Sequence, residues 1–342
     1  MVITSKKFAE TTEPDCTNGL FDDVLDSLRI TGTLLLRETY TPPWAVSIPD
    51  SIKLAEFLGE EQPVHVVAFH LVESGHCVIE LPGETELLLR AGEMVVAFGG
   101  VAHRLAVGRG GKVQPVETLL SGGPNIQRGN PEVGPEDTAL LCGVFLLRNT
   151  AFNPLLSALP PILRSSLSRP GEFHNLSGVA RLITEEVDRT SMAGGFIVER
   201  LLEVLCAETI RCYIERSNIS QANWIRGVRD PVIGRAIAAI HRRPGDQWTV
   251  ARLAGLISLS PSRFAARFAE SVGQSPMAYL TQWRMSLACR KLVESRLGIE
   301  RIAEQAGYES PAAFSRAFKK HMGMSPGVWR SRKCVGSDIQ RS

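Results

Sequence analysis

Residues 260–276, SPSRFAARFAESVGQSP, recur fifty residues later as SPAAFSRAFKKHMGMSP at positions 310–326. Both copies keep a Ser-Pro start, two phenylalanines four residues apart and a Gly-X-Ser-Pro end. The apolar pattern before each copy also recurs, with residues 250–254 matched by 299–303 at an offset of 49. A repeat that keeps its turn, apolar and basic positions together indicates one structural unit used twice.

Each copy is predicted to be a helix-turn-helix unit, in which a short helix precedes a turn and a second helix follows it. Thr249 and Ser260 are of the residue type that caps helix starts, so they predict helices that begin at residues 250 and 261. Gly307 can supply the positive φ that the second turn requires, and Ser310 repeats the cap. One long helix over residues 276–296 is predicted to fix the two units relative to each other.

The second helix of each unit is expected to present a face that reads double-stranded DNA. The phenylalanine pairs are predicted to point inward and anchor each helix to its unit. Arginine can read guanine bidentately, and small residues allow contact with thymine methyls. To read one DNA face, the two helices must lie roughly 34 Å apart. The predicted DNA-binding residues are Ser262, Arg263, Ala266 and Arg267 in the first unit, and Ala312, Ser315, Arg316 and Lys319 in the second.

Charge is distributed unevenly along the 342 residues, although the net charge is only +2. Residues 231–342 hold 18 Lys and Arg against 7 Asp and Glu, and the preceding residues hold 20 against 29. This layout is typical of a nucleic-acid-binding domain attached to another domain. The N-terminus lacks the apolar core of a signal peptide, and the longest apolar run, residues 139–147, is too short to span a bilayer. A cytoplasmic protein with no membrane partner is expected.

The rest of the chain divides into a β-rich stretch and a helical stretch. A short amphipathic helix is predicted at residues 17–30. Between residues 31 and 147, short β-rich runs alternate with glycine and proline, as in a sandwich or barrel. Residues 107–135 are rich in glycine and proline and are predicted to be a loop region. Helical segments are then predicted at residues 153–167, broken by Pro160-Pro161, and at residues 177–190 and 195–216.

The last of these helices carries a broad apolar stripe. The stripe comprises Ile197, Leu201 and Leu205, widened by Leu202, Val204 and Ile210. Such a helix packs on its own domain or pairs with its twin in a dimer, and both can hold on different faces. Residues 217–230 are polar and lack strong periodicity, which predicts an interdomain linker.

Seven cysteines are scattered along the chain, and none form a Cys-X-X-Cys pair. A disulfide framework or a structural zinc site is therefore not predicted. Reduced, mostly buried thiols are the simplest interpretation. Redox sensing by Cys16 or Cys77 is the alternative.

Residues 230–330 resemble the DNA-binding domain of the AraC/XylS family of transcription regulators. The landmarks include Ile240-His241, Trp248-Thr249-Val250, Ser260-Pro261-Ser262-Arg263-Phe264, Tyr279-Leu280, Trp283-Arg284, Gly307-Tyr308 and Pro326-Gly327-Val328-Trp329-Arg330. The resemblance implies binding to promoter half-sites, contact with RNA polymerase, and activation rather than repression. In this family the first recognition helix usually makes base contacts, and the second varies more.

Residues 17–215 resemble the cupin-type sensory domains of one AraC/XylS subgroup. The segment from Gly92 to His103 follows the second cupin motif, with Phe98 in place of its proline. A metal cupin also requires two histidines and a glutamate in its first motif, but Ala68 stands at the glutamate position, and residues 62–66, where the histidine pair belongs, contain only His65. Neither a metal nor another cofactor is therefore predicted.

Trp44, His70 and His103 are the predicted effector-binding residues of this domain. The two histidines are expected to converge in the barrel and hold a ligand, and Trp44 is expected to line the same pocket. Hydrogen-bonded core histidines are one alternative, and a soft metal bound with the help of a thiol is another.

The predicted fold class is α+β. An N-terminal cupin-like β-barrel with a helical dimerisation segment occupies residues 17–216, a linker 217–230, and an all-α double helix-turn-helix domain 231–333. The chain is predicted to be a sequence-specific transcription regulator rather than an enzyme, controlled by a small-molecule or stress signal and able to form a homodimer. The alternatives are a cupin enzyme fused to a DNA-binding domain, and a cysteine-based redox-responsive regulator.

Overall fold

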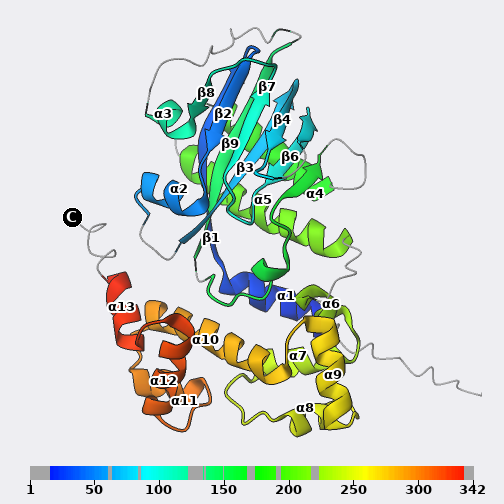
Figure 1. Cartoon of the computed structure of the whole chain (residues 1–342), viewed down its shortest axis with the longest axis vertical. Coiled ribbons are helices and arrows are strands. Elements are labelled where there is room, and N and C mark those ends of the chain that lie inside the picture. Colours follow the sequence, from blue (N-terminus) through cyan, green and yellow to red (C-terminus); the bar gives the residue numbers. More distant parts are fainter. Residues whose placement is uncertain are drawn as a thin grey trace, which may run out of the picture. The chain divides into compact units, whose positions relative to one another are not determined.

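The computed structural model describes residues 16–60, 64–83, 86–121, 134, 136–148, 150–167, 174–189, 194–216 and 223–334. The chain forms two compact units (Figure 1). A β-rich unit comprises residues between Leu28 and Asn218, and a helical unit combines the first helix with residues between Ile219 and Arg330. The predicted α+β class, with a sheet-rich N-terminal part and a helical C-terminal part, is confirmed.

The β-rich unit consists of two five-stranded sheets that enclose an apolar core. The first sheet has the order β1 (Arg29–Tyr40), β9 (Thr138–Arg148), β3 (Val64–Ser74), β6 (Glu93–Val96) and β10 (Leu163–Ser166). The second has the order β5 (Leu87–Arg90), β4 (His76–Glu80), β7 (His103–Val107), β2 (Trp44–Ile48) and β8 (Val113–Pro115). Neighbouring strands run antiparallel except β2 and β8, which are parallel.

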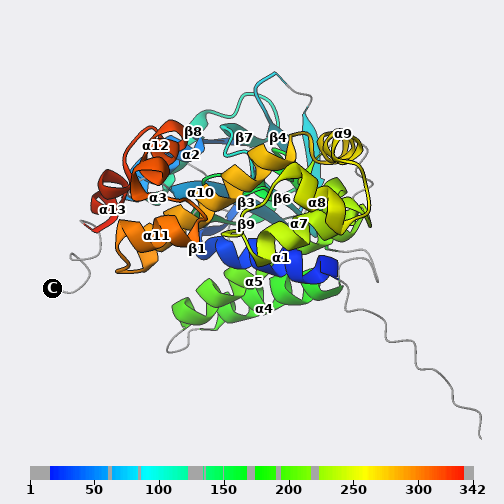
Figure 2. The same ribbon diagram turned by 90° about the horizontal axis from the view of Figure 1, so that it is seen from below.

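Helices cover the outer face of the first sheet, so its central strands β3 and β9 are buried along almost their whole length. The long helix α5 (Gly194–Arg216) packs on β1 and β9, beside α4 (His174–Asp188) (Figure 2). The close packing of α5 on β1 depends on Gly32 of β1, because a Cβ atom there would lie 2.3 Å from the Cβ of Leu202 on α5. The short helix α2 (Ser51–Phe57) packs on β3.

The prediction of a helix over residues 153–167 is wrong. The segment contains one 3₁₀ turn, η1 (Leu156–Ala158), and the strand β10, which pairs with β6. Pro160 and Pro161 interrupt the helical hydrogen-bond pattern, and the following residues pair with the free edge of β6. The predicted loop region 107–135 also contains regular structure, namely β8 and α3 (Val116–Leu120).

The C-terminal helices form the two predicted helix-turn-helix units. The first consists of α8 (Val250–Leu256) and α9 (Pro261–Val272), and the second of α11 (Ile299–Gln305) and α12 (Pro311–Met322). The long helix α10 (Pro276–Glu294) joins them. Further helices of this unit are α7 (Ile233–Arg242) and α13 (Pro326–Cys334).

The helix caps and the turns follow the sequence pattern. The side chains of Thr249, Ser260 and Ser310 accept hydrogen bonds from backbone N–H groups in the first turns of α8, α9 and α12. The turn is one residue longer in the second unit, as the change of offset from 49 to 50 predicts. Gly307 has a φ of 75° there, whereas Ser258 takes the corresponding position of the first turn with a φ of 56°.

Two helices lie at the ends of the predicted sensory domain and linker. Helix α1 (Cys16–Ser27) packs within the helical unit, since Leu20 and Val24 are buried and Phe21 packs edge-on against Trp224 at 5.2 Å. Helix α6 (Trp224–Arg229) lies within the predicted linker 217–230. Its Trp224, Ile225 and Val228 are buried. Although the segment is polar as a whole, these three side chains form one apolar helix face that packs into the core. Residues 217–222 lie outside the described ranges.

Candidate functional site

The recognition helices α9 and α12 are anchored by phenylalanines. Phe264 and Phe268 of α9, and Phe314 and Phe318 of α12, are fully buried, and each pair has ring centroids 5.6 Å apart. The four-residue spacing places both rings of a pair on the same inner face of the helix. The prediction that these rings point inward is confirmed, and it fixes which face of each helix is left for solvent.

The outer faces expose the predicted DNA-binding residues to different degrees. Ser262, Arg263 and Ala266 of α9 are exposed, as are Ala312, Arg316 and Lys319 of α12, while Ser315 and Arg267 are half-buried. Within the part of the chain that the structure describes, neither Arg263 nor Arg316 has an ion-pair partner for its guanidinium. Both guanidinium groups therefore remain available to an anionic ligand.

Arg267 is held by Asp230 instead of projecting freely. Its Nε and Nη2 atoms donate to the two carboxylate oxygens over distances of 2.9–3.1 Å. Asp230 also accepts hydrogen bonds from the backbone N–H groups of Val232 and Ile233 at the start of α7. Burial alone would raise the pKa of Asp230, but these N–H groups and the guanidinium lower it. Arg267 therefore ties α9 to the α6–α7 junction.

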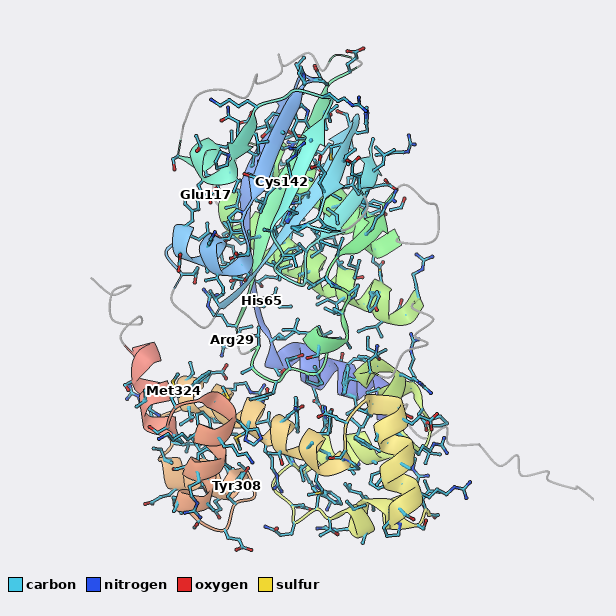
Figure 3. All side chains as sticks on the ribbon, in the orientation of Figure 1. Arg29, His65, Glu117, Cys142, Tyr308 and Met324 are labelled. Carbon is cyan, nitrogen blue, oxygen red and sulfur yellow. The ribbon has the colours of Figure 1, made fainter. Side chains whose placement is uncertain are left out.

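Arg284 of α10 connects the two helix-turn-helix units. Its Nε and Nη2 atoms donate to the backbone carbonyls of Pro244 and Asp246, each at 2.7 Å, in the loop before α8. The same guanidinium lies 5.9 Å from the ring centroid of Tyr308, in the turn of the second unit (Figure 3). The glycine at 307 has its backbone against Arg284, so a Cβ there would lie 2.6 Å from Nη2. The turn of one unit and the loop of the other thus share one side chain.

A buried polar chain lies under the first recognition helix. The Trp224 indole N–H donates to the Tyr279 hydroxyl at 2.8 Å, and that hydroxyl donates to Nε2 of His241 at 2.6 Å. The His241 ring stacks on Trp283, with centroids 4.0 Å apart. Burial lowers the pKa of His241 to about 3, so this histidine is neutral near pH 7.

In the β-rich unit, the two predicted histidines meet. Nε2 of His70 on β3 lies 2.8 Å from Nε2 of His103 on β7, and both residues are buried. Nδ1 of His103 lies 2.9 Å from the carbonyl oxygen of Val101. Burial lowers the pKa of both imidazoles. The pKa of His70 is lowered further, because a positive charge on the neighbouring His103 would repel a proton on His70. The neutral rings therefore share a hydrogen bond.

His70 borders an apolar cavity of about 30 Å³ inside the unit. Its other walls are Leu35, Leu36, Tyr40, Val46, Ile48, Leu54, Ala68, Leu105, Val116, Leu140, Cys142, Gly143 and Val144. Cys142 lies opposite His70 in the pairing of β3 with β9, and Figure 3 shows it within the sheets. Trp44 does not line this cavity but packs on Tyr40, which does, at 5.0 Å.

His103 borders a second, open cleft. This cleft has a volume of about 470 Å³, and its polar walls include Glu80, Arg104 and Glu117. Arg104 and Glu80 form an ion pair at 3.0 Å. His65, near the start of β3 (Figure 3), donates to the Phe98 carbonyl. The described residues include no group of three or more His, Cys, Asp or Glu side chains able to hold a metal ion.

The cysteines that the structure describes are buried and free: Cys77, Cys142, Cys206, Cys212 and Cys289. Burial raises the pKa of Cys77 to about 12, which is the opposite of the shift that produces a reactive thiolate. The side chains of Cys16 and Cys334 lie outside the described part.

The sequence alone did not indicate three of these features. Asp230 could only be interpreted as the end of a linker, because its partner lies 37 positions later in the chain. Arg284 was a family landmark without an assigned role. Cys142 stood in an apolar run with no signal that it faces His70.

Two helix-turn-helix units joined by α10, together with a cupin-like unit, define a DNA-binding transcription regulator with a cupin-type N-terminal domain. Residues 20–215 match a family model described as a cupin, and residues 253–332 match one described as a helix-turn-helix domain. The chain belongs to the AraC-like transcription regulators.

Similar proteins include a putative AraC-like transcription regulator of Streptomyces lividans, 33% identical over 78% of this chain and 86% of that protein. The RCS-specific HTH-type transcriptional activator RclR of Escherichia coli is 27% identical over 78% of this chain and 85% of its own. Among solved structures, the C-terminal domain of the response regulator AraT from Geobacillus stearothermophilus is 33% identical over 30% of this chain and 85% of that one, with a TM-score of 0.29.

Among the residues that the structure describes, no helix combines the length and the apolar character that crossing a bilayer requires.

Proposed function

We propose that this transcription regulator reads two DNA half-sites with α9 and α12 and responds to an effector bound beside His70 and His103. The observation that carries the DNA part is the pair of exposed guanidinium groups, Arg263 and Arg316, on helices whose inner faces are fixed by buried phenylalanines. Arginine in the major groove reads guanine through two hydrogen bonds.

The proposed DNA contacts are Ser262, Arg263, Ala266 and Arg267 with Ala312, Ser315, Arg316 and Lys319. Their roles differ, because the ion pair with Asp230 restrains Arg267. We assign base reading to Arg263 and Arg316, and phosphate contact to Arg267 and Lys319. The small residues Ser262, Ala266, Ala312 and Ser315 allow close approach of the helices to the bases.

The change Arg316→Ala tests this assignment. We expect binding to the preferred site to weaken by about 1–3 kcal/mol, with relaxed preference at one base pair. A matched control is Arg301→Ala, which removes an exposed arginine of α11 that is paired with Glu304. Fluorescence anisotropy with the preferred duplex and with single-base variants measures both effects. An equal loss on every duplex would assign Arg316 to phosphate, and no loss would remove α12 from the interface.

The effector part rests on the cavity at His70, whose walls are mostly apolar and whose polar side chains are His70 and Tyr40. An effector changes DNA occupancy only if it binds one conformation better than another. The change Ala68→Leu should fill the cavity of about 30 Å³ and abolish the response to an effector in a promoter-reporter assay. The control Ala139→Leu alters a half-buried position of β9 that does not line the cavity. Loss of the response in the control alone would refute the assignment.

We also infer a homodimer formed through α4 and α5. Leu182 of α4 and Phe196, Ile197 and Val204 of α5 are exposed, although Leu202, Leu205 and Ile210 of α5 are buried against the sheet. The apolar stripe thus has one face for the unit itself and one for a twin helix. The variant Val204→Glu tests this inference. Analytical ultracentrifugation should show that the variant is a monomer while the parent is a dimer.

By family resemblance we propose a cytoplasmic activator that contacts RNA polymerase and has no catalytic activity. A cupin enzyme fused to the DNA-binding domain is the second candidate, and it requires a metal or a catalytic group at His70 and His103. Tightly bound stoichiometric iron or manganese in the purified protein would favour it. A redox switch through Cys16 or Cys77 requires a reactive thiolate, and the raised pKa of Cys77 argues against that residue.

A further inference from the structure

We propose that the cavity at His70 selects neutral molecules that have an apolar body and one hydrogen-bond donor, and that the donor binds to Nδ1 of His70. This inference rests on the proposed role of the cavity as the effector site and adds the chemical class of the effector. It follows from the order of hydrogen bonds in the histidine pair.

The Val101 carbonyl sets the tautomer of His103. A carbonyl oxygen only accepts, so Nδ1 of His103, 2.9 Å away, must have the proton. A buried imidazole without a counter-ion is neutral and has one N–H group. Nε2 of His103 is therefore a lone pair, and it faces Nε2 of His70 at 2.8 Å.

His103 in turn sets the tautomer of His70. Since Nε2 of His103 accepts, Nε2 of His70 must donate, and the second nitrogen of this neutral ring is then a lone pair. That nitrogen, Nδ1, is buried and has no hydrogen-bond partner among the described residues. Because an unsatisfied buried acceptor costs about 1–3 kcal/mol, a donor that reaches it gains affinity.

The other walls of the cavity restrict what else binds. Apart from Tyr40, whose side chain has a hydroxyl, they are apolar or weakly polar, and no Lys, Arg, Asp or Glu is among them. A carboxylate would bring a charge into this environment opposite the lone pair of His70, at a large desolvation cost. A lone water would fit a cavity of about 30 Å³ but requires two to four polar partners. An alcohol or phenol has the apolar body and the single donor that these walls favour.

His103 acts here as a positioning residue. It does not line the cavity, but its lone pair keeps the proton of His70 on Nε2. Larger effectors require movement of the walls, and Leu35 and Leu36 lie at an irregularity of β1, where the register with β9 shifts between Leu34 and Leu36. Two partly buried side chains at a bulge are the part of the wall best placed to move.

Nitrogen NMR of the full-length chain labelled with ¹⁵N-histidine tests the tautomers directly. Long-range ¹H–¹⁵N correlations at pH 7.5 should show His70 with its proton on Nε2 and His103 with its proton on Nδ1. The variants His70→Gln and His103→Asn assign the signals. The glutamine introduced at position 70 keeps a donor near the place of Nε2, so the hydrogen bond to His103 survives. The asparagine introduced at position 103 keeps a donor near the place of Nδ1, so the hydrogen bond to the Val101 carbonyl survives. A proton on Nδ1 of His70 would overturn the inference.

Titration with propan-2-ol and acetone then tests the selectivity, because the two molecules match in shape and only the alcohol donates. We expect the alcohol to shift the Nδ1 resonance of His70 and to bind about fivefold more tightly than acetone. The change His70→Gln should abolish this preference. Equal binding of both molecules at the cavity would overturn the proposed preference for a hydrogen-bond donor. It would not contradict the proposal that the cavity is the effector site. If neither molecule nor dissolved xenon perturbs signals of the cavity walls, the proposed effector site fails as well.

Discussion

Removal of the Arg284 guanidinium should loosen the link between the two helix-turn-helix units. The change Arg284→Met keeps the length and the apolar stem of the side chain and deletes both hydrogen bonds to the Pro244 and Asp246 carbonyls. It also deletes the contact with the Tyr308 ring in the other unit. The long helix α10 remains, so the units stay connected but lose their cross-link.

The magnitude follows from the two bonds. Hydrogen bonds from a charged group contribute about 1.5–3 kcal/mol each, and the lower end applies because Arg284 is half-buried and the carbonyls can regain water. We therefore expect the free energy of unfolding to fall by about 3 kcal/mol. Two rigidly held readers gain affinity from simultaneous engagement. We expect the affinity for a two-half-site duplex to fall by about tenfold and that for a single half-site to stay within about twofold.

Urea denaturation measures the first effect, and anisotropy titrations with one-site and two-site duplexes measure the second. The control Arg296→Met removes an exposed arginine beyond the end of α10. The reasoning is refuted if Arg284→Met leaves the free energy of unfolding within about 0.5 kcal/mol of the parent. An equal loss of affinity on both duplexes would also refute it, since a loosened link acts only on the two-site duplex.

Three further predictions concern the helical unit. The change Arg267→Ala should lower the free energy of unfolding by about 1 kcal/mol, because it leaves Asp230 without its charged partner; urea denaturation checks this, and an unchanged midpoint would contradict it. Stability should fall as the pH drops from about 6.5 towards 3, by at most about 1.4 kcal/mol per pH unit, because the unfolded chain binds a proton that the buried His241 does not. The variant His241→Gln should flatten that slope in urea titrations between pH 7 and 5, and equal slopes would contradict the account. The change Phe21→Ala should lower the melting temperature of the helical unit, with a loss of about 2 kcal/mol for a half-buried ring on Trp224; a loss confined to the β-rich unit would be inconsistent with the packing of α1.

The sequence predicted the helical unit well because its signals are local. A serine cap, two phenylalanines four residues apart and a glycine after the helix are all read within one or two turns of chain. The one-residue difference between the turns could be predicted for the same reason. The strand β10 could not, since a strand at a sheet edge depends on β6, about seventy residues earlier in the chain.

The candidate sites show the same division. Exposure of Arg263 and Arg316 follows from helical periodicity, so their place on the outer faces was predictable. The restraint of Arg267 by Asp230 was not, because the ion pair joins a residue of α9 to the α6–α7 junction, 37 positions earlier in the chain. Likewise the meeting of His70 and His103 was expected from motif resemblance. The tautomers of the two rings depend on the hydrogen bond to the Val101 carbonyl, which no sequence pattern indicates.

The central claim is that two linked recognition helices read two half-sites on one face of DNA. Selection of duplexes from a randomised library by the full-length protein tests it most directly. The account predicts two conserved sequence blocks with centres about 10–10.5 base pairs apart, because that spacing returns the major groove to the same face. A single conserved block, or two blocks separated by half a helical turn, would contradict the claim.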